Sequence, residues 1–353
     1  MLEKVLSQYK ISLQATIKPF GTGLINRTWL VKDGDTEYIF QKINKNVFKE
    51  PVNISYNIDL VENYLNKNHS GYFFVAPIRT RDRESMARDG KDYYRLFPFV
   101  PGSRTYDVVQ TPGQAFEAAR QFGLFTQLLS GLPSEKLKIT LPGFHDLTSR
   151  YSQFEYACIH GNAMRISETK SEIDFIKSNA SIVTVFENIR TSSHFKLRAT
   201  HHDTKISNVL FDRDNRGICV IDLDTVMPGY FISDVGDMLR TYLSPVSEEE
   251  TDFSRIEVRE DYFRAILDGY LSCMAGELNG HEVQHFVYAG MFMIYMQAIR
   301  FLTDHLNNDI YYGAAYEGHN YVRAKNQITL LQRLQEKEVV LSQFVTNAVL
   351  HYS

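Results

Sequence analysis

The sequence predicts an α+β fold of two lobes, a small β-rich lobe over residues 1–100 and a larger α-rich lobe over residues 101–353. Three observations predict it. Strand-like runs dominate the first hundred residues, Pro101-Gly102-Ser103 interrupts that pattern, and most later segments have helical periodicity. The chain has 353 residues, 44% of them hydrophobic, enough to bury one large core or two ordinary ones.

The small lobe is predicted as a strand pair, a helix and a second strand pair. Alternation of apolar and polar residues and runs of β-branched and aromatic residues predict the strands. Two Asp-Gly dipeptides, Asp33-Gly34 and Asp89-Gly90, are typical of hairpin turns. The predicted strands are residues 11–15, 27–31, 38–40, 73–79 and 93–100, and apolar residues at helical spacing predict a helix over residues 51–66.

The large lobe is predicted to be mainly helical. Its helices are expected over residues 115–129, 168–188, 259–276, 283–306 and 320–336, with short strands and loops over 197–224. Met291, Met293 and Met296 share one apolar segment and are expected in the core rather than on a binding surface.

Composition excludes several classes of protein. The chain has 38 basic and 42 acidic residues, a net charge of −4, and no basic stripe, so nucleic acid is not an expected partner. The cysteines, Cys158, Cys219 and Cys273, lie far apart, which argues against a disulfide framework or a structural zinc site. The N-terminus lacks a signal-peptide pattern, and the most apolar stretch, residues 286–296, is too short to span a bilayer. A cytoplasmic monomer or weak dimer is expected.

One stretch carries a clear chemical pattern. Residues 201–208, HHDTKISN, fit H-x-D-x-K-x-x-N, and Asp222 follows the next apolar run. Phosphoryl transfer to a hydroxyl needs a carboxylate near the attacking oxygen and oxygen ligands for magnesium. Asp203 fits the first need, and Asn208 with Asp222 fits the second. The alternative is a polar surface loop, but the agreement of four spaced positions with the downstream acid favours catalysis.

These segments resemble the catalytic and metal loops of the protein-kinase-like phosphotransferases, the superfamily of aminoglycoside phosphotransferases and choline kinases. Within it, THHDTKISNVLFD followed by VIDLDTVMPG resembles the N-acetylhexosamine 1-kinase group. The resemblance implies ATP and Mg²⁺ as cofactors, a two-lobed protein-kinase-like fold, and the three roles just given. It also implies that Lys205 approaches the transferred phosphate and that His201 and Asp237 brace the loop.

The resemblance places a nucleotide between the lobes. Gly21 and Gly23 would let a backbone loop approach the phosphates, although a plain hairpin turn is the alternative. Phe97 and Phe99 would pack on adenine from the segment that connects the lobes, where a plain interlobe strand would also need apolar residues.

One position departs from the kinase pattern. Gln41 stands where protein kinases place a phosphate-pairing lysine on the third strand, and Lys42 follows it on the opposite face. Either a bulge turns Lys42 inward, with Glu62 as its partner, or another group contacts the phosphates. Both residues are therefore candidates for nucleotide binding, and a solvated Lys42 is the alternative.

A distant cluster is the candidate acceptor site. Arg300 ends a strongly apolar helical segment, and an i,i+4 surface ion pair with Asp304 is the ordinary explanation. Sugars, however, are bound by planar polar groups beside aromatic rings, and RFLTDHLNNDIYY resembles the hexosamine-kinase group. Arg300 and Tyr311 are therefore candidates for sugar binding, with Thr225 after the metal loop and Asp309 as further candidates.

Together these patterns predict an ATP-dependent kinase of a sugar hydroxyl. The resemblance implies the anomeric hydroxyl of an N-acetylhexosamine as acceptor and a sugar 1-phosphate as product. Two alternatives stay open. A kinase of another small alcohol, such as an aminoglycoside, a polyol or choline, would keep the same loops. A non-catalytic nucleotide-binding module is favoured by the missing lysine at position 41 and opposed by Asp203, Asn208 and Asp222.

Overall fold

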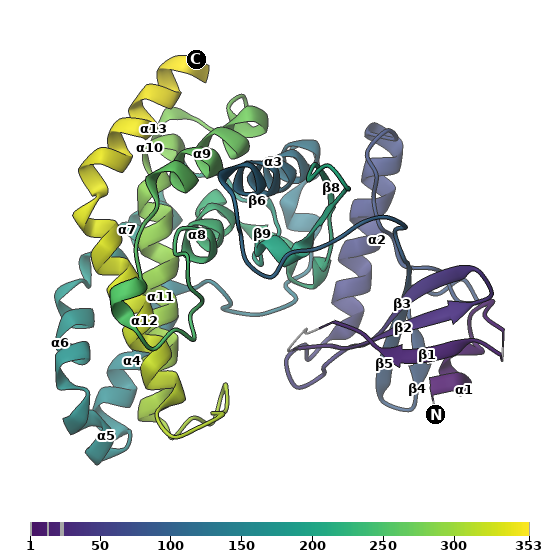
Figure 1. Cartoon of the computed structure of the whole chain (residues 1–353), viewed down its shortest axis with the longest axis horizontal. Coiled ribbons are helices and arrows are strands. Elements are labelled where there is room, and N and C mark those ends of the chain that lie inside the picture. Colours follow the sequence, from purple (N-terminus) through teal and green to yellow (C-terminus); the bar gives the residue numbers. More distant parts are fainter. Residues whose placement is uncertain (1, 13, 22–24, 353) are drawn as a thin grey trace.

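The chain folds into a small lobe built on a β-sheet and a larger lobe built from helices (Figure 1). The computed structural model describes residues 2–12, 14–21 and 25–352. In Figure 1 the sheet, drawn in purple, lies at one end of the molecule, and the C-terminal helices, drawn in yellow, lie at the other. The predicted α+β class with a small β-rich part and a large α-rich part is confirmed.

The small lobe holds one antiparallel five-stranded sheet in the order β1-β2-β3-β5-β4. The predicted hairpin at Asp33-Gly34 joins β2 to β3, and the turn at Asp89-Gly90 joins β4 to β5. A short helix α1 precedes the sheet. The elements are α1 Leu2–Leu6, β1 Thr16–Pro19, β2 Arg27–Asp33, β3 Thr36–Lys42, β4 Ala87–Asp89 and β5 Asp92–Pro98.

Two predicted strands are wrong. Residues 11–15 precede the first strand, which begins at Thr16. Residues 73–79 form an irregular segment, and the strand that pairs with β5 across the Asp89-Gly90 turn is instead the short β4. Pro77 lacks the N–H that a ladder requires, and only one backbone bond, from Ile78 N–H to Leu96 O at 2.7 Å, connects this segment to the edge of the sheet.

Helix α2, Pro51–Asn68, connects the lobes by packing. Its apolar face belongs to the same buried cluster as the large lobe, while the sheet has a separate core that includes Val31, Phe40 and Leu96. Asn57 fixes the contact, because its side-chain amide donates to Lys138 O and Val226 O, each at 2.8 Å. In Figure 1, α2 lies between the sheet and the helical lobe.

The large lobe consists of helices around two small β-ribbons. The ribbons pair β6 with β9 and β7 with β8. Their bounds are β6 Arg198–Thr200, β7 Val209–Phe211, β8 Gly217–Val220 and β9 Met227–Gly229. The helices are α3 Pro112–Leu128, α4 Leu147–His160, α5 Ala163–Glu168, α6 Lys170–Ser178, α7 Ser181–Thr191, α8 Phe231–Tyr242, α9 Glu260–Met274, α10 Gly280–Gln284, α11 Phe286–Leu306, α12 His319–Glu336 and α13 Glu338–Tyr352.

The predicted helices over residues 115–129, 259–276 and 320–336 correspond to α3, α9 and α12. The other helices of the large lobe were predicted with different bounds or were not predicted. The predicted helix over residues 168–188 is broken into α6 and α7 at Asn179, whose side chain donates to Phe175 O at 2.9 Å and competes with the helical pattern. The segment over residues 283–306 is likewise divided between α10 and α11, and α4, α5, α8 and α13 were not predicted.

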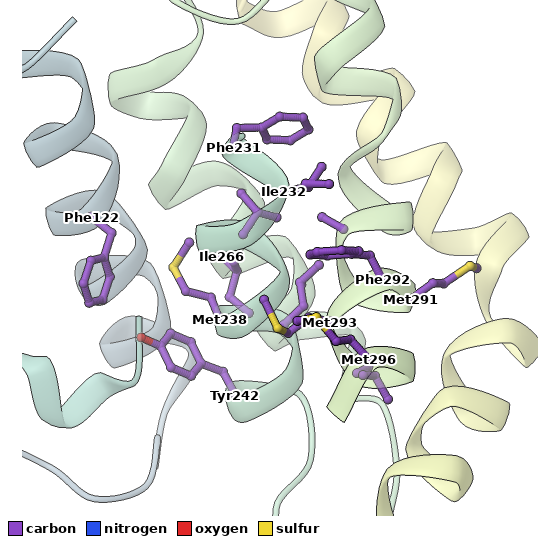
Figure 2. Close-up of a cluster of buried hydrophobic side chains, with 14 of the residues drawn as sticks. Phe122, Phe231, Ile232, Met238, Tyr242, Ile266, Met291, Phe292, Met293 and Met296 are labelled. Carbon is purple, nitrogen blue, oxygen red and sulfur yellow. The ribbon is translucent and has the colours of Figure 1, made fainter. Parts of the chain in front are cut away.

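Helix α11 is the central element of the large lobe. Figure 2 shows Met293 and Met296 among side chains that include Met238 and Ile266, and all four are buried, so the predicted core role of the methionines is confirmed. Helix α11 has 21 residues and a mean hydropathy of 1.3 over its most apolar window, so it is long and apolar enough to cross a bilayer. The prediction from residues 286–296, that the apolar stretch is too short to span a bilayer, is therefore wrong about its length. That window is 78% buried inside the protein, as expected for a core helix.

Two helix pairs approach closely at glycines. A methyl group on Gly269 of α9 would collide with the Phe116 carbonyl of α3, and one on Gly236 of α8 would collide with the Ala289 carbonyl of α11. Because α8 follows the β-ribbons in the chain, its tight packing on α11 holds the ribbons and the loops between them in place.

Candidate active site

The segment of residues 201–208, called the catalytic loop after its expected role, lies between β6 and β7 and is held by two buried carboxylates of α8. Asp234 accepts hydrogen bonds from the backbone N–H groups of His201, at 3.1 Å, and His202, at 2.7 Å. Asp237 accepts one from Thr204 N–H at 2.8 Å. The expected bracing role of Asp237 is therefore present. Asp234 was missed, although its position three residues before Asp237 places both on one helix face.

His201 braces the loop from the inside. Its Nε2 lies 3.0 Å from Ile221 O, and its ring packs edge-on against Phe122 with centroids 5.1 Å apart. Burial lowers the pKa of His201, so the ring is held in its neutral form as a donor to that carbonyl. His201 thus ties the catalytic loop to the residue before Asp222.

Asp203 and Asn208 occupy the two ends of the turn. The Asn208 side-chain nitrogen donates to Asp203 O at 2.8 Å, which leaves the Asn208 Oδ1 free to accept a ligand. The Lys205 Nζ lies 3.3 Å from Asp203 Oδ1, and its side chain is 49% exposed. The Asp203 carboxylate raises the pKa of Lys205, so the lysine is cationic beside the carboxylate.

Asp222 lies next to Asn208 because Ile221 N–H donates to Asn208 O at 2.9 Å. The residue adopts a left-handed backbone conformation, with φ of 60°, which ends β8 and begins the short turn Leu223–Thr225. Burial and the neighbouring Asp224 carboxylate raise the pKa of Asp222 to about 7. A carboxylate in such a position gains from a nearby cation, which favours its ionised form.

The donor set fits magnesium better than a transition metal. Over residues 2–12, 14–21 and 25–352, no group of three or more His, Cys, Asp or Glu side chains is placed to hold a metal. Magnesium, however, needs only one or two carboxylates with phosphate and water as further ligands. The free Oδ1 of Asn208 and the carboxylate of Asp222 are hard oxygen donors on adjacent loops.

Both residues line one large cleft, with a volume of about 2540 Å³, which also contains Asp203 and Lys205. The two sides of this cleft are named here after the ligands that the sequence predicts for them. The nucleotide side is lined by Gly21, Gln41, Arg95, Phe97 and Phe99, and the acceptor side is lined by Phe144, Arg150, Arg300, Tyr311 and Tyr312.

On the nucleotide side, four of the sequence candidates face the cleft, namely Gly21, Gln41, Phe97 and Phe99. Gly21 has φ of 75°, a conformation that favours glycine. The ring of Phe99 packs edge-on against Phe20, with centroids 6.3 Å apart, beside the start of the loop. Gly23 lies outside the described residues.

The structure does not bring Lys42 into the cleft. Its Nζ lies on the other face of β3, 2.5 Å from Asp92 Oδ2, because successive residues of a strand point to opposite faces. Glu62 is not its partner and instead pairs with Arg79 at 2.8 Å. Between the two possibilities that the sequence left open, the structure favours the one in which another group faces the phosphates.

That part of the cleft holds a cation which the sequence analysis missed. Arg95 of β5 lies opposite Gln41 in the strand register and is only 1% exposed. Its guanidinium forms a buried ion pair with Asp224, and its Nε donates a hydrogen bond to Gln41 Oε1 at 3.0 Å. The available signal was a single basic residue in the middle of a mainly apolar and aromatic strand.

On the acceptor side, Arg300 lies between two aromatic rings. Its guanidinium carbon is 5.6 Å from the ring centre of Phe144 and 5.4 Å from that of Tyr312. Its Nη1 donates to Gln297 Oε1 at 3.0 Å, and its buried Nε has no hydrogen-bond partner among the described residues. Arg300 therefore has donor capacity left for a ligand.

Asp304 does not pair with Arg300. Its carboxylate instead accepts the backbone N–H groups of Tyr311, at 2.7 Å, and Tyr312, at 2.9 Å, and the side-chain amide of Asn320 at 3.1 Å. The surface ion pair considered from the sequence is thus absent, and Asp304 with Asn320 clamps the loop that carries Tyr311. Neither residue was identified as part of the site.

Two acceptor candidates are engaged in other contacts. The Asp309 carboxylate is bonded to Arg165 Nη1 at 2.7 Å and to Asn320 Nδ2 at 2.9 Å, so it supports the loop rather than facing the cleft. Thr225 lines the cleft, but its hydroxyl donates to His201 O at 2.6 Å. Tyr311 stands at the rim with 67% of its surface exposed.

Comparison with known proteins identifies the family of these loops. A family model described as the phosphotransferase enzyme family matches residues 16–275, which include the five-stranded sheet, part of the larger lobe, residues 201–208 and Asp222. Arg300 and the loop that carries Tyr311 lie after the matched region.

Several solved structures share the fold. An aminoglycoside phosphotransferase from Alicyclobacillus acidocaldarius is 13% identical, with a TM-score of 0.64, over 98% of this chain and 96% of that chain. A choline kinase from Cryptosporidium parvum is 13% identical, with a TM-score of 0.56, over 99% and 98%. A microcompartment-associated aminopropanol kinase is 14% identical, with a TM-score of 0.63, over 97% and 98%. At these identities the likeness shows the fold and leaves the acceptor undetermined.

Proposed function

We propose, because the chain belongs to the phosphotransferase enzyme family, that it transfers the γ-phosphate of ATP to a hydroxyl group of a sugar. Asp203 is the proposed base, because its carboxylate stands in the cleft at the start of the turn that carries Asn208. It accepts the proton of the attacking hydroxyl as the new O–P bond forms and the bond from the γ-phosphorus to the β-phosphate oxygen breaks, which releases ADP.

Asn208 and Asp222 are the proposed magnesium ligands. When bound, the ion supplies positive charge to the phosphates. The protein's part is to fix the two donor oxygens, which the Asn208–Asp203 hydrogen bond and the backbone bond from Ile221 to Asn208 do. Lys205, beside Asp203, is placed to approach the transferred phosphate.

The nucleotide is proposed to bind against Gly21, Gly23, Gln41, Phe97 and Phe99. The apolar rings on the connecting strand suit a purine, and the backbone around Gly21 suits close approach to phosphate. Lys42 is excluded from this proposal because it pairs with Asp92 on the opposite face of β3.

Charge pairing on the acceptor side argues against a cationic acceptor. The positive charge of choline, aminoglycosides and amino alcohols is stabilised by free carboxylates or by aromatic rings. The rings of Phe144 and Tyr312 already flank the guanidinium of Arg300. Here Glu248 is paired with Arg240 and Arg323, and Asp304 is occupied by backbone N–H groups. Arg300, by contrast, forms no ion pair with any carboxylate among the described residues.

Arg150, a further guanidinium that lines the acceptor side, extends this argument. Its Nη1 donates to Gln153 Oε1 at 3.1 Å, and its buried Nε has no partner among the described residues. Burial and the nearby charge of Arg300 lower the pKa of Arg150. A site with unneutralised guanidinium groups donates hydrogen bonds to hydroxyl or amide oxygens and repels an ammonium group.

An N-acetylhexosamine is the proposed acceptor, and its anomeric hydroxyl is the proposed site of transfer. Arg300 and Tyr311, together with Phe144 and Tyr312, offer donors beside aromatic faces, an arrangement that suits a pyranose ring. The segments that resemble the hexosamine-kinase group include this loop. An anomeric hydroxyl is more acidic than an ordinary alcohol, which eases its deprotonation by a carboxylate.

The enzyme is proposed to act in the cytoplasm as a monomer or weak dimer. Cys158, Cys219 and Cys273 are free thiols in the structure, which is typical of a reducing compartment.

The observation that carries the proposal is that one cleft is lined by Asp203, Asn208 and Asp222 and also by Arg300. The test is an ADP-release assay with magnesium and ATP, in which N-acetylglucosamine, N-acetylgalactosamine, glucose, glucuronate, choline, ethanolamine and an aminoglycoside are compared. Turnover is expected with the N-acetylhexosamines. Phosphorus NMR of the product is expected to show an anomeric phosphate.

Asp203→Asn serves as the control for this assay, because it removes the base and keeps the shape of the side chain. Turnover of choline or an aminoglycoside without turnover of any sugar would contradict the sugar acceptor and leave the phosphotransferase family assignment intact. ATP binding without turnover of any acceptor would favour a nucleotide-binding module.

A further inference from the structure

The cleft face of β3 carries no cation. Gln41 occupies the position that faces the nucleotide side, and the only neighbouring lysine, Lys42, is paired with Asp92 on the other face. Protein kinases place a lysine on this strand to pair the phosphates, and a glutamate of the following helix orients it. In this chain the corresponding helix carries Glu62, which is paired with Arg79.

A cation reaches the same place from the adjacent strand. Arg95 of β5 is the register partner of Gln41 of β3, so the two side chains lie side by side on the cleft face of the sheet. The Gln41 Oε1 accepts a hydrogen bond from Arg95 Nε at 3.0 Å, and the Gln41 Nε2 donates to Thr28 Oγ1 at 3.2 Å. Gln41 thus holds the guanidinium in position rather than supplying charge itself.

Two of the three guanidinium nitrogens of Arg95 form hydrogen bonds within the protein, and the third lies toward the loop that carries Asp222. Nε is bonded to Gln41, and Nη1 is bonded to the buried carboxylate of Asp224. Nη2 lies 3.8 Å from the Oδ1 of Asp222, the proposed magnesium ligand. A donor beside that ligand is in the region where the phosphates that share the ion must lie.

Asp224 connects this arrangement to the glycine-containing loop. Its Oδ2 accepts a hydrogen bond from Asn26 Nδ2 at 2.7 Å, and Asn26 Oδ1 accepts one from Asn44 N–H at 3.0 Å. Asn26 immediately precedes β2, and Gly21 lies shortly after the end of β1. The carboxylate therefore orients Arg95 and anchors the phosphate-side loop at the same time.

We propose that Arg95 is the residue that binds the α- and β-phosphates of the nucleotide, and that its ion pair with Asp224 replaces the lysine–glutamate pair of protein kinases. This rests on the proposed kinase function and names the phosphate-binding cation of that same cleft. An arginine suits the task because its planar fork can hold a carboxylate on one edge and present N–H donors to phosphate on another.

The test measures nucleotide affinity by calorimetry, with magnesium, for adenosine, ADP and ATP. In Arg95→Ala, the dissociation constants of ADP and ATP are expected to rise about ten- to a hundredfold, the size of one or two lost charge-assisted hydrogen bonds. The affinity for adenosine should stay within about twofold, because adenosine has no phosphate. Arg79→Ala is the matched control, since it removes another ion-paired arginine of the small lobe, and should leave all three affinities unchanged.

Arg95→Lys addresses the risk that the alanine variant fails to fold, because it keeps the charge next to Asp224. It should raise the KM for ATP several-fold and leave the KM for the acceptor unchanged. If the folded variants keep the wild-type ratio of adenosine affinity to ADP affinity, Arg95 only connects the two lobes and the proposal is wrong. The proposed kinase function would then still stand. If the wild-type protein binds no nucleotide, both proposals fall.

Discussion

The side-chain amide of Asn208 donates a hydrogen bond to the backbone carbonyl of Asp203, with 2.8 Å between the heavy atoms. The proposed base and a proposed magnesium ligand are therefore parts of one hydrogen-bonded turn. Asp234 and Asp237 hold the same turn from α8. In the proposed mechanism this hydrogen-bonded turn would fix the position of the base relative to the magnesium ligand.

Asp203→Asn is expected to lower kcat by about two to four orders of magnitude, because the amide cannot accept the hydroxyl proton. Nucleotide affinity should be preserved, since the backbone bond to Asn208 does not use the Asp203 side chain. Steady-state kinetics and calorimetry with ATP check both parts. Asp214→Asn, an exposed carboxylate in the turn between β7 and β8, is the control. A nearly active Asp203→Asn enzyme would remove this residue from the mechanism.

Asp222→Asn is expected to raise the magnesium concentration needed for half-maximal activity by at least about tenfold, because one charged ligand becomes neutral. The measurement is turnover as a function of free magnesium at fixed ATP. Because Asp222 is also 3.8 Å from Arg95, the adenosine affinity should be measured as a check on the fold. An unchanged magnesium dependence would show that Asp222 is not a metal ligand.

Arg300→Ala is expected to raise the KM for the sugar about ten- to a hundredfold, as donors to the acceptor are lost. The KM for ATP should change little, because Arg300 lies between Phe144 and Tyr312 on the acceptor side. Gln153→Ala, which removes only the neutral partner of Arg150, serves as a control for local disturbance. Equal increases in both KM values would instead indicate damage to the fold.

Gly269→Ala is expected to destabilise the protein by about 1–3 kcal/mol, because the added methyl group collides with the Phe116 carbonyl and forces α9 away from α3. Urea unfolding measures the change. Gly276→Ala, where the methyl group meets no atom within 4 Å, should be close to neutral. Equal stabilities of the two variants would contradict the close helix contact.

His202 is expected to make stability depend on pH. Burial lowers the pKa of His202 to about 4, below the value of about 6.5 in an unfolded chain. Between these values the unfolded state binds the proton and the folded state does not, so this contribution to stability is present above about pH 6.5 and is lost as the pH falls toward 4. A shift of this size corresponds to about 3 kcal/mol.

The measurement compares the unfolding free energies of wild type and His202→Asn at pH 7.5 and pH 4.5. Asparagine tolerates the positive φ of 67° at this position and does not titrate. The stability advantage of the wild type should shrink by about 2–3 kcal/mol at the lower pH. The raised pKa values of Asp222 and Asp234 act in the opposite direction but are common to both proteins, so they cancel. A pH-independent difference would contradict a neutral buried His202.

Local sequence patterns predicted the features whose causes lie within a few residues. The hairpin at Asp33-Gly34 forms because a two-residue turn fixes its own register. The catalytic loop was recognisable because its residues are spaced along one short segment. The predicted strand over residues 73–79 was wrong because the prediction gave more weight to the apolar residues of the segment than to Pro77. The predicted single helix over residues 168–188 was wrong because the helix is interrupted at Asn179.

The remaining parts of the site depend on contacts between distant segments. Arg95 and Asp224 are 129 residues apart, and no local pattern indicates that a charge in β5 meets a carboxylate beyond β8. Asp304 was read as a surface partner of Arg300 because they are one helical turn apart, whereas the backbone of Tyr311 and Tyr312 competes for it more effectively. Such competition is decided by tertiary structure.

The clamp of Asp304 and Asn320 on the loop of Tyr311 has an evolutionary consequence. The family model ends at residue 275, so Arg300 and the loop of Tyr311 lie after the matched region, whereas Phe144 and Arg150 on the same side of the cleft lie within it. Changes in α11, α12 and their connecting loop therefore alter one part of the proposed acceptor site and leave residues 201–208 as they are. Chimaeras that exchange this C-terminal stretch between relatives offer a direct way to re-target the enzyme.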